Sequence, residues 1–173
     1  MPKQRAGRGA RPRGRLRVAV VAARWNAEIT ARLASGAVAA ARDAGAAVDS
    51  FTVAGSFELP AAVAALADTG AYDAVVPVGC LIKGETPHFE YIASAVSQGL
   101  MELSITYPAA VPFGVLTCNT VAQAKARAGG RLGNQGAEAM EAALEMVALY
   151  RTIASSRRRS SRIARTASST RTS

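Results

Sequence analysis

The sequence predicts an α/β protein, a three-layer α/β/α sandwich around a central, mainly parallel four-stranded sheet. Two patterns support this prediction. The expected strands are apolar at nearly every position, as in strands that are covered on both faces. Segments with helical periodicity separate them, which favours parallel pairing. At 173 residues the chain fits a single domain, because domains commonly run to about 100–150 residues.

The first half of the sandwich has clear local signals. Residues 17–23 form an apolar run that predicts a strand, and residues 27–44 are an alanine-rich stretch that predicts a helix. Gly45 then suits the left-handed conformation in which many helices end. Residues 47–53 predict the second strand. Residues 58–67 predict a helix with Pro60 in its first turn.

The second half continues the alternation. Residues 74–82 are the longest apolar run and predict the third strand, followed by a helix from residue 86 to about residue 103. Residues 112–118 predict the fourth strand, and a short helix is expected around residues 122–128. A last helix is expected from about residue 134 to residue 153, because its apolar residues recur at helical spacing.

The basic surplus of this chain lies at its two ends. Residues 1–15 carry six basic residues and residues 151–173 carry seven, and neither segment has an acidic residue. Residues 16–150 carry eight basic and twelve acidic residues, a net charge of −4. We therefore expect one folded domain over residues 16–154 between disordered basic tails, residues 1–15 and 155–173. Such tails either make a weak contact with nucleic acid or another polyanion, or only keep the protein in solution.

The compartment predicted from the sequence is the cytoplasm. No apolar run approaches the ~18 residues that a membrane span needs, and the arginine-rich start lacks the apolar core of a secretory signal. Cys80 and Cys118 show neither metal-ligand spacing nor a disulfide framework. We expect both thiols to be reduced and to pack as small hydrophobic groups.

The segment Gly84–Phe89 is the strongest candidate for a functional site. It follows the third strand directly and holds His88, the only histidine of the chain. Thr86 suits an N-cap and Pro87 the first helical position, so a helix start with free N–H groups is expected here. Helix starts of this kind hold phosphates, and a histidine side chain can exchange protons near neutral pH. The alternative is a capped helix with an incidental exposed histidine.

The scarce aromatic residues are a second indication. The only tryptophan, Trp25, and three of the four phenylalanines fall at strand ends or in loops rather than inside strands. Flat side chains at the carboxyl ends of parallel strands suit a planar ligand. They also suit an interface between subunits, or they fold back onto the core.

Six segments together resemble the lumazine synthase family over about residues 15–150. They lie in order along the chain, most of them at strand ends: residues 24–26, 53–60, 78–91, 112–117, 123–129 and 133–136. The resemblance implies a flavodoxin-like sandwich. It also implies a transferase of riboflavin biosynthesis that needs no metal or organic cofactor. Its reaction condenses 5-amino-6-(D-ribitylamino)uracil with 3,4-dihydroxy-2-butanone 4-phosphate, giving 6,7-dimethyl-8-ribityllumazine, phosphate and water.

By this resemblance, one group of residues holds the pyrimidine substrate. Trp25 stacks on its ring, and Phe113 of a neighbouring subunit supplies a second aromatic wall. Three residues line the pocket for the ribityl chain, namely Ser56, Phe57 and Glu58. The pyrimidine edge meets backbone groups of three further residues, namely Cys80, Leu81 and Ile82.

A second group, again by resemblance, serves the phosphate and the proton transfers. Glu85 and Thr86 bracket the phosphate, His88 shuttles protons, and Arg127 of the next subunit grips the phosphate through charge-assisted hydrogen bonds. Shared sites of this kind imply a homo-oligomer, either a pentamer or a 60-mer of twelve pentamers.

The chain departs from the family pattern in one place. Gln135 stands where the family commonly has a lysine, so an uncharged donor replaces a charged one. Arg131, four residues earlier, can restore positive potential. Two other readings stay open: a related enzyme such as the archaeal type of riboflavin synthase, and a shell-forming or polyanion-binding protein in which the tails matter most.

Overall fold

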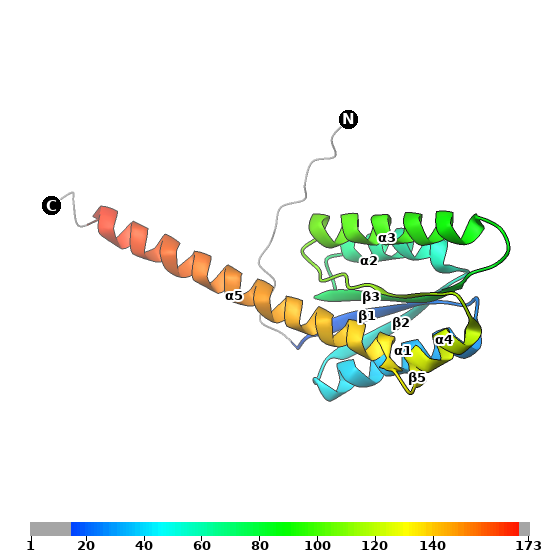
Figure 1. Cartoon of the computed structure of the whole chain (residues 1–173). Coiled ribbons are helices and arrows are strands. Elements are labelled where there is room, and N and C mark those ends of the chain that lie inside the picture. Colours follow the sequence, from blue (N-terminus) through cyan, green and yellow to red (C-terminus); the bar gives the residue numbers. More distant parts are fainter. Residues whose placement is uncertain (1–14, 170–173) are drawn as a thin grey trace.

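A parallel four-stranded sheet forms the centre of the molecule, as Figure 1 shows. The computed structural model describes residues 15–169, and for residues 158–169 only the course of the backbone. The strands are β1 (Arg17–Ala23), β2 (Ala47–Val53), β3 (Ala74–Ile82) and β4 (Gly114–Cys118), in the order β2-β1-β3-β4. Every pair is parallel, so the predicted sheet is confirmed.

Helices cover both faces of the sheet and complete the three layers. One face carries α1 (Ala27–Asp43), α4 (Val121–Arg127) and α5 (Gln135–Ser169), while the other carries α2 (Leu59–Asp68) and α3 (His88–Thr106) (Figure 1). A single 3-10 turn, η1 (Ser56–Glu58), leads into α2. Each face has its own core. Leu33 and Met140 are fully buried on the first face, and Leu59 and Val63 on the second.

Most of the predicted elements match within a few residues, and Gly45 has the expected left-handed conformation with φ 74°. Two elements were not predicted. A small antiparallel hairpin, β5 (Ala128–Gly130) and β6 (Gly133–Asn134), joins α4 to α5. Its strands are too short to show a period-2 pattern, and both Gly129 and Gly133 have positive φ. The turn that these two glycines make was missed.

Helix α5 is much longer than predicted. It continues to Ser169, whereas the sequence suggested an end near residue 153 and disorder from residue 155. The stretch has no glycine or proline to end a helix and is rich in arginine and alanine, which favour one. The helix extends well beyond the sandwich (Figure 1). Among the described helices, none combines the length and the apolar character needed to cross a membrane.

The sheet leaves part of β3 open, and this positions the candidate site. The pairing of β1 with β3 ends at Ala22 and Val78, but β3 continues to Ile82. After β1 the chain turns away into α1, so backbone groups of β3 beyond Val78 have no strand beside them on that side. Gaps of this kind at the carboxyl ends of parallel strands are where α/β proteins bind ligands.

Candidate active site

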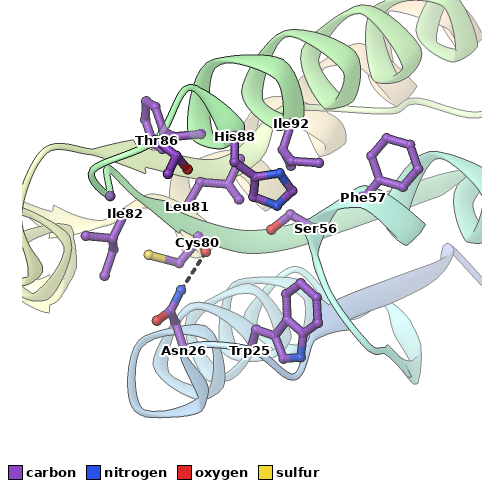
Figure 2. A pocket seen from close by; sticks show the side chains of 12 residues that line it. Trp25, Asn26, Ser56, Phe57, Cys80, Leu81, Ile82, Thr86, His88 and Ile92 are labelled. Carbon is purple, nitrogen blue, oxygen red and sulfur yellow. Dashed lines mark hydrogen bonds between the residues drawn. The ribbon is translucent and has the colours of Figure 1, made fainter.

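A cavity of about 210 Å³ lies at this opening of the sheet (Figure 2). Eight of the predicted site residues line it, and they come from four separate segments: Trp25, Ser56, Phe57, Cys80, Leu81, Ile82, Thr86 and His88. Four more lining residues were not among the predicted ones: Asn26, Gly84, Phe89 and Ile92. The cavity is therefore where the sequence placed a site, with additional walls.

Trp25 is held against the backbone of the next loop. Its side chain is 65% exposed, yet a methyl group at position 55 would lie 2.7 Å from its Cε3 atom. The Trp25 N–H donates to the carbonyl of Ala54 at 3.1 Å. Because Gly55 has no side chain, the indole can rest on the loop and keep the rest of its ring surface open to a ligand.

We expect Gly55→Ala to displace Trp25. The backbone of Gly55 is extended, with φ −136°, so alanine adds a clash but no backbone strain. Trp25 is the only tryptophan, so its fluorescence reports on this loop alone. The expected result is a red-shifted emission and easier quenching by acrylamide, with a stability loss below the ~1–3 kcal/mol typical of core overpacking. Gly84→Ala is the matched control, since a methyl group there meets nothing within 4 Å. Unchanged Trp25 emission in Gly55→Ala would contradict the packing described above.

Ser56 and Glu58 have different surroundings, although both belong to η1. Ser56 is buried and lines the cavity, and a methyl group at Gly79 of β3 would lie 2.6 Å from its Oγ atom. Glu58 is exposed and its Oε2 atom accepts a hydrogen bond from the N–H of Gly55 at 2.8 Å. One carboxylate oxygen of Glu58 thus holds the loop under Trp25.

The open edge of β3 presents alternate backbone groups to the cavity. The side-chain amide of Asn26 donates to the carbonyl oxygen of Cys80 at 2.9 Å (Figure 2). On the other edge, the N–H of Lys83 donates to the carbonyl oxygen of Cys118 in β4 at 2.9 Å. Backbone groups alternate along a strand, so those of Cys80 and Ile82 face the cavity side, and Leu81 reaches the cavity through its side chain.

The Cys80 thiol is not a candidate nucleophile. Burial raises the pKa of Cys80 to about 12, and the neighbouring Cys118 adds to this. Only a thiolate reacts as a nucleophile. Cys80 therefore contributes its backbone and its volume.

His88 is the first residue of α3 and lies on the α3 side of the cavity, across from Trp25 (Figure 2). The predicted cap at Thr86 is wrong. The chain bends through Glu85 and Thr86, Pro87 takes the N-cap position, and no side chain caps the helix. The helix thus begins two residues later than predicted. The N–H groups of its first turn remain without a side-chain partner, which keeps the expected anion site available.

A salt bridge braces the loop in front of α3. Lys83 Nζ lies 3.0 Å from Glu90 Oε1, and this hydrogen bond lowers the pKa of the Glu90 carboxyl. Both side chains are half exposed, so the bridge adds little to stability. Its effect is to join the end of β3 to the first turn of α3, on either side of Glu85 and Thr86.

Four predicted site residues do not line the cavity of their own chain, namely Glu58, Glu85, Phe113 and Arg127. Phe113 directly precedes Gly114, which pairs with Val78. At about 3.3 Å per residue, Phe113 lies roughly 15 Å back along the sheet from Ile82. Arg127 ends α4, is partly exposed, and donates to the carbonyl oxygen of Gln123 at 3.2 Å.

Asn26 is the clearest residue that the sequence reasoning left out. It has φ 60°, the only positive φ outside glycine in the described chain. Asparagine tolerates this conformation better than most residues, so an asparagine between the first strand and its helix was a readable signal. Gln135 is half-buried as the first residue of α5, and it does not line the cavity.

Comparison with known proteins identifies relatives over the whole folded body. Residues 15–151 match the family model described as 6,7-dimethyl-8-ribityllumazine synthase. A protein of that name from Corynebacterium efficiens is 51% identical over 132 residues, covering 75% of this chain and 82% of its own. Its namesake from Anaeromyxobacter dehalogenans is 46% identical over 142 residues, covering 80% and 88%. Another from Gemmatimonas aurantiaca is 46% identical over 143 residues, covering 80% and 87%.

Proposed function

The chain belongs to the 6,7-dimethyl-8-ribityllumazine synthase family, and we propose that the cavity between Trp25 and His88 is its active site. The enzyme is a transferase of riboflavin biosynthesis. It condenses 5-amino-6-(D-ribitylamino)uracil with 3,4-dihydroxy-2-butanone 4-phosphate, with loss of phosphate and water. The observation that carries the proposal is that eight predicted residues from four segments line one cavity.

The pyrimidine substrate lies on the exposed face of Trp25. Its polar edge meets the backbone of Cys80 and Ile82, which no strand covers on the cavity side. The ribityl chain extends along Ser56 and Phe57. Glu58 uses one oxygen to hold Gly55, and its other oxygen accepts a ribityl hydroxyl. Together these contacts orient the amino group that attacks the ketone, which is how a two-substrate site gains most of its acceleration.

The phosphate of the second substrate lies at the start of α3. The N–H groups of its first turn and the hydroxyl of Thr86 donate to the phosphate oxygens, and Glu85 lies beside them. His88, in the same turn, moves protons during imine formation and phosphate elimination. Stacking, phosphate binding and proton transfer thus take place within a single cavity.

Phe113 and Arg127 serve the cavity of a neighbouring subunit. Phe113 lies roughly 15 Å along the sheet from the cavity of its own chain, and Arg127 does not line that cavity. Helix α3 also exposes Tyr91, Met101 and Ile105, each at least 64% exposed. Apolar surface of this kind is typical of a subunit interface. The assembly is a ring, by family resemblance a pentamer, and twelve pentamers can close into a 60-mer.

The direct test of this function mixes the purified protein with the two substrates and records the fluorescence of the lumazine product. Product formation that depends on both substrates is the expected result. Absence of product from assembled, folded protein would exclude this function and favour another ribityl-pyrimidine enzyme. The proposal also puts the enzyme in the cytoplasm, where the two buried free cysteines, Cys80 and Cys118, stay reduced.

The basic ends of the chain are a separate feature, for which we propose a weak contact with nucleic acid. Residues 151–173 hold seven basic residues and no acidic one, and most of this segment continues α5 beyond the sandwich (Figure 1). The body between the ends carries a net charge of −4, so it does not favour a polyanion by itself. A ring multiplies weak contacts of its tails through avidity.

We expect removal of residues 2–14 and 158–173 to leave both Michaelis constants and kcat within about twofold, because no residue of the proposed site lies there. The truncation keeps Arg151, which is paired with Asp73 at 3.3 Å. RNA binding should fall, and the dependence of log K on log salt should flatten by roughly 0.7 per lost contact with single-stranded RNA. Exchange of the tail arginines for lysines is the control, since it keeps the charge. Equal RNA binding before and after truncation would refute the contact, and lost turnover in an assembled truncation would misplace the site.

A further inference from the structure

Asn134 connects three elements through one carboxamide group. Its Oδ1 atom accepts hydrogen bonds from the N–H groups of Gly136 and Ala137 at 2.9 and 3.2 Å, which caps the start of α5. Its Nδ2 atom donates to the carbonyl oxygen of Arg32, inside α1, at 2.9 Å. Its backbone belongs to β6, where it pairs with Ala128 of β5. The side chain thus joins the hairpin, α5 and α1.

Two glycines make room for this junction. A methyl group at Gly36 of α1 would lie 2.4–2.6 Å from the three outer atoms of the Asn134 side chain. At Gly136 of α5, a methyl group would collide with the carbonyl of Leu33 in α1. The carboxamide therefore fits against bare helix backbone, and its position has little freedom.

The junction is one residue away from Arg127 on the opposite strand. Arg127 ends α4 and is followed directly by Ala128, the partner of Asn134. The turn is closed by a hydrogen bond from the N–H of Leu132 to the carbonyl of Ala126 at 2.8 Å. Lys125 Nζ contacts Glu28 Oε1 of α1 at 3.0 Å, but this pair is exposed. The most buried link between the Arg127 segment and α1 is therefore the one through Asn134.

We propose that Asn134 is a positioning residue that fixes Arg127 for the phosphate subsite of the neighbouring subunit. The inference rests on the proposed function, in which Arg127 reaches across the subunit boundary. A guanidinium binds phosphate well only when its fork is correctly placed. Loss of the link to α1 therefore weakens binding of butanone phosphate and leaves binding of the pyrimidine substrate as it was.

Asn134→Asp separates the two roles of the side chain. A carboxylate still accepts the N–H groups of Gly136 and Ala137, so α5 keeps its cap. It has no proton to donate to the Arg32 carbonyl, and the two oxygens repel. We expect the KM for butanone phosphate to rise roughly 10-fold, with the KM for the pyrimidine unchanged within twofold. Arg127→Gln should raise the same KM by more. The double variant should equal Arg127→Gln alone, because the two act through one contact.

Two further variants keep the inference testable. Gly36→Ala expels the carboxamide from α1 while favouring the helix, and it should reproduce the KM change even if Asn134→Asp does not fold. Thr69→Ala removes two hydrogen bonds at the end of α2, far from the junction, and should lower Tm without moving either KM. A change in both KM values, or full additivity with Arg127→Gln, would overturn the inference. If Arg127→Gln alone changes nothing, the proposed role of Arg127 fails, and that outcome is distinguishable.

Discussion

His88→Ala should slow turnover by roughly 10²–10⁴-fold, the range expected when a general acid–base group is lost. His88 is the only histidine of the chain, so no second imidazole can take over. The residue is exposed at the first position of α3, and its removal leaves no buried cavity. We therefore expect the stability and the assembly of the variant to match those of the parent protein.

Three measurements separate this role from a role in binding. Quenching of Trp25 fluorescence by the pyrimidine substrate should give an unchanged Kd, because the stacking face is untouched. Added imidazole should restore part of the rate. Glu90→Gln, which breaks the Lys83 salt bridge in the same helical turn, should retain most of the activity and serves as the control. A His88→Ala enzyme with the parent kcat would remove His88 from the mechanism.

The fold could be predicted from the sequence because its strands are buried on both faces. Val18, Val20, Val21 and Val76 are at most 1% exposed, and such runs allow few arrangements other than a covered parallel sheet. The predictions failed where local preference was the only guide. The hairpin of β5 and β6 depends on two glycines with positive φ, and the length of α5 depends on the absence of a helix breaker.

The candidate site could be predicted in part, for a physical reason. Trp25 and His88 follow strands whose carboxyl ends must meet at one edge of the sheet, so their proximity follows from topology. The roles of Asn26 and Asn134 could not be predicted this way. Each is defined by a hydrogen bond across more than fifty residues, from Asn26 to Cys80 and from Asn134 to Arg32. Polar contacts of that kind leave no periodic signal in the sequence.

The sharing of each site between two subunits leads to the second large effect. Trp25→Ala and Arg127→Ala should each lower activity strongly, since one loses the stacking face and the other the phosphate clamp. Chains of the two variants, unfolded together and reassembled in equal amounts, should regain activity. In a randomly mixed ring, about a quarter of the boundaries between subunits bring an intact Trp25 cavity to an intact Arg127. The mixture should thus recover roughly a quarter of the parent rate per site.

The matched control is a mixture of Trp25→Ala with His88→Ala chains. Trp25 and His88 line the same cavity of one chain, so every site in that mixture carries one of the two defects, and no activity should return. The contrast between the two mixtures distinguishes a shared site from simple stabilisation by mixing. If native mass spectrometry shows mixed rings and the Trp25 and Arg127 variants still recover nothing, each site is built within one chain. Arg127 would then need a role other than binding the neighbour's phosphate, and the junction at Asn134 would serve only the fold.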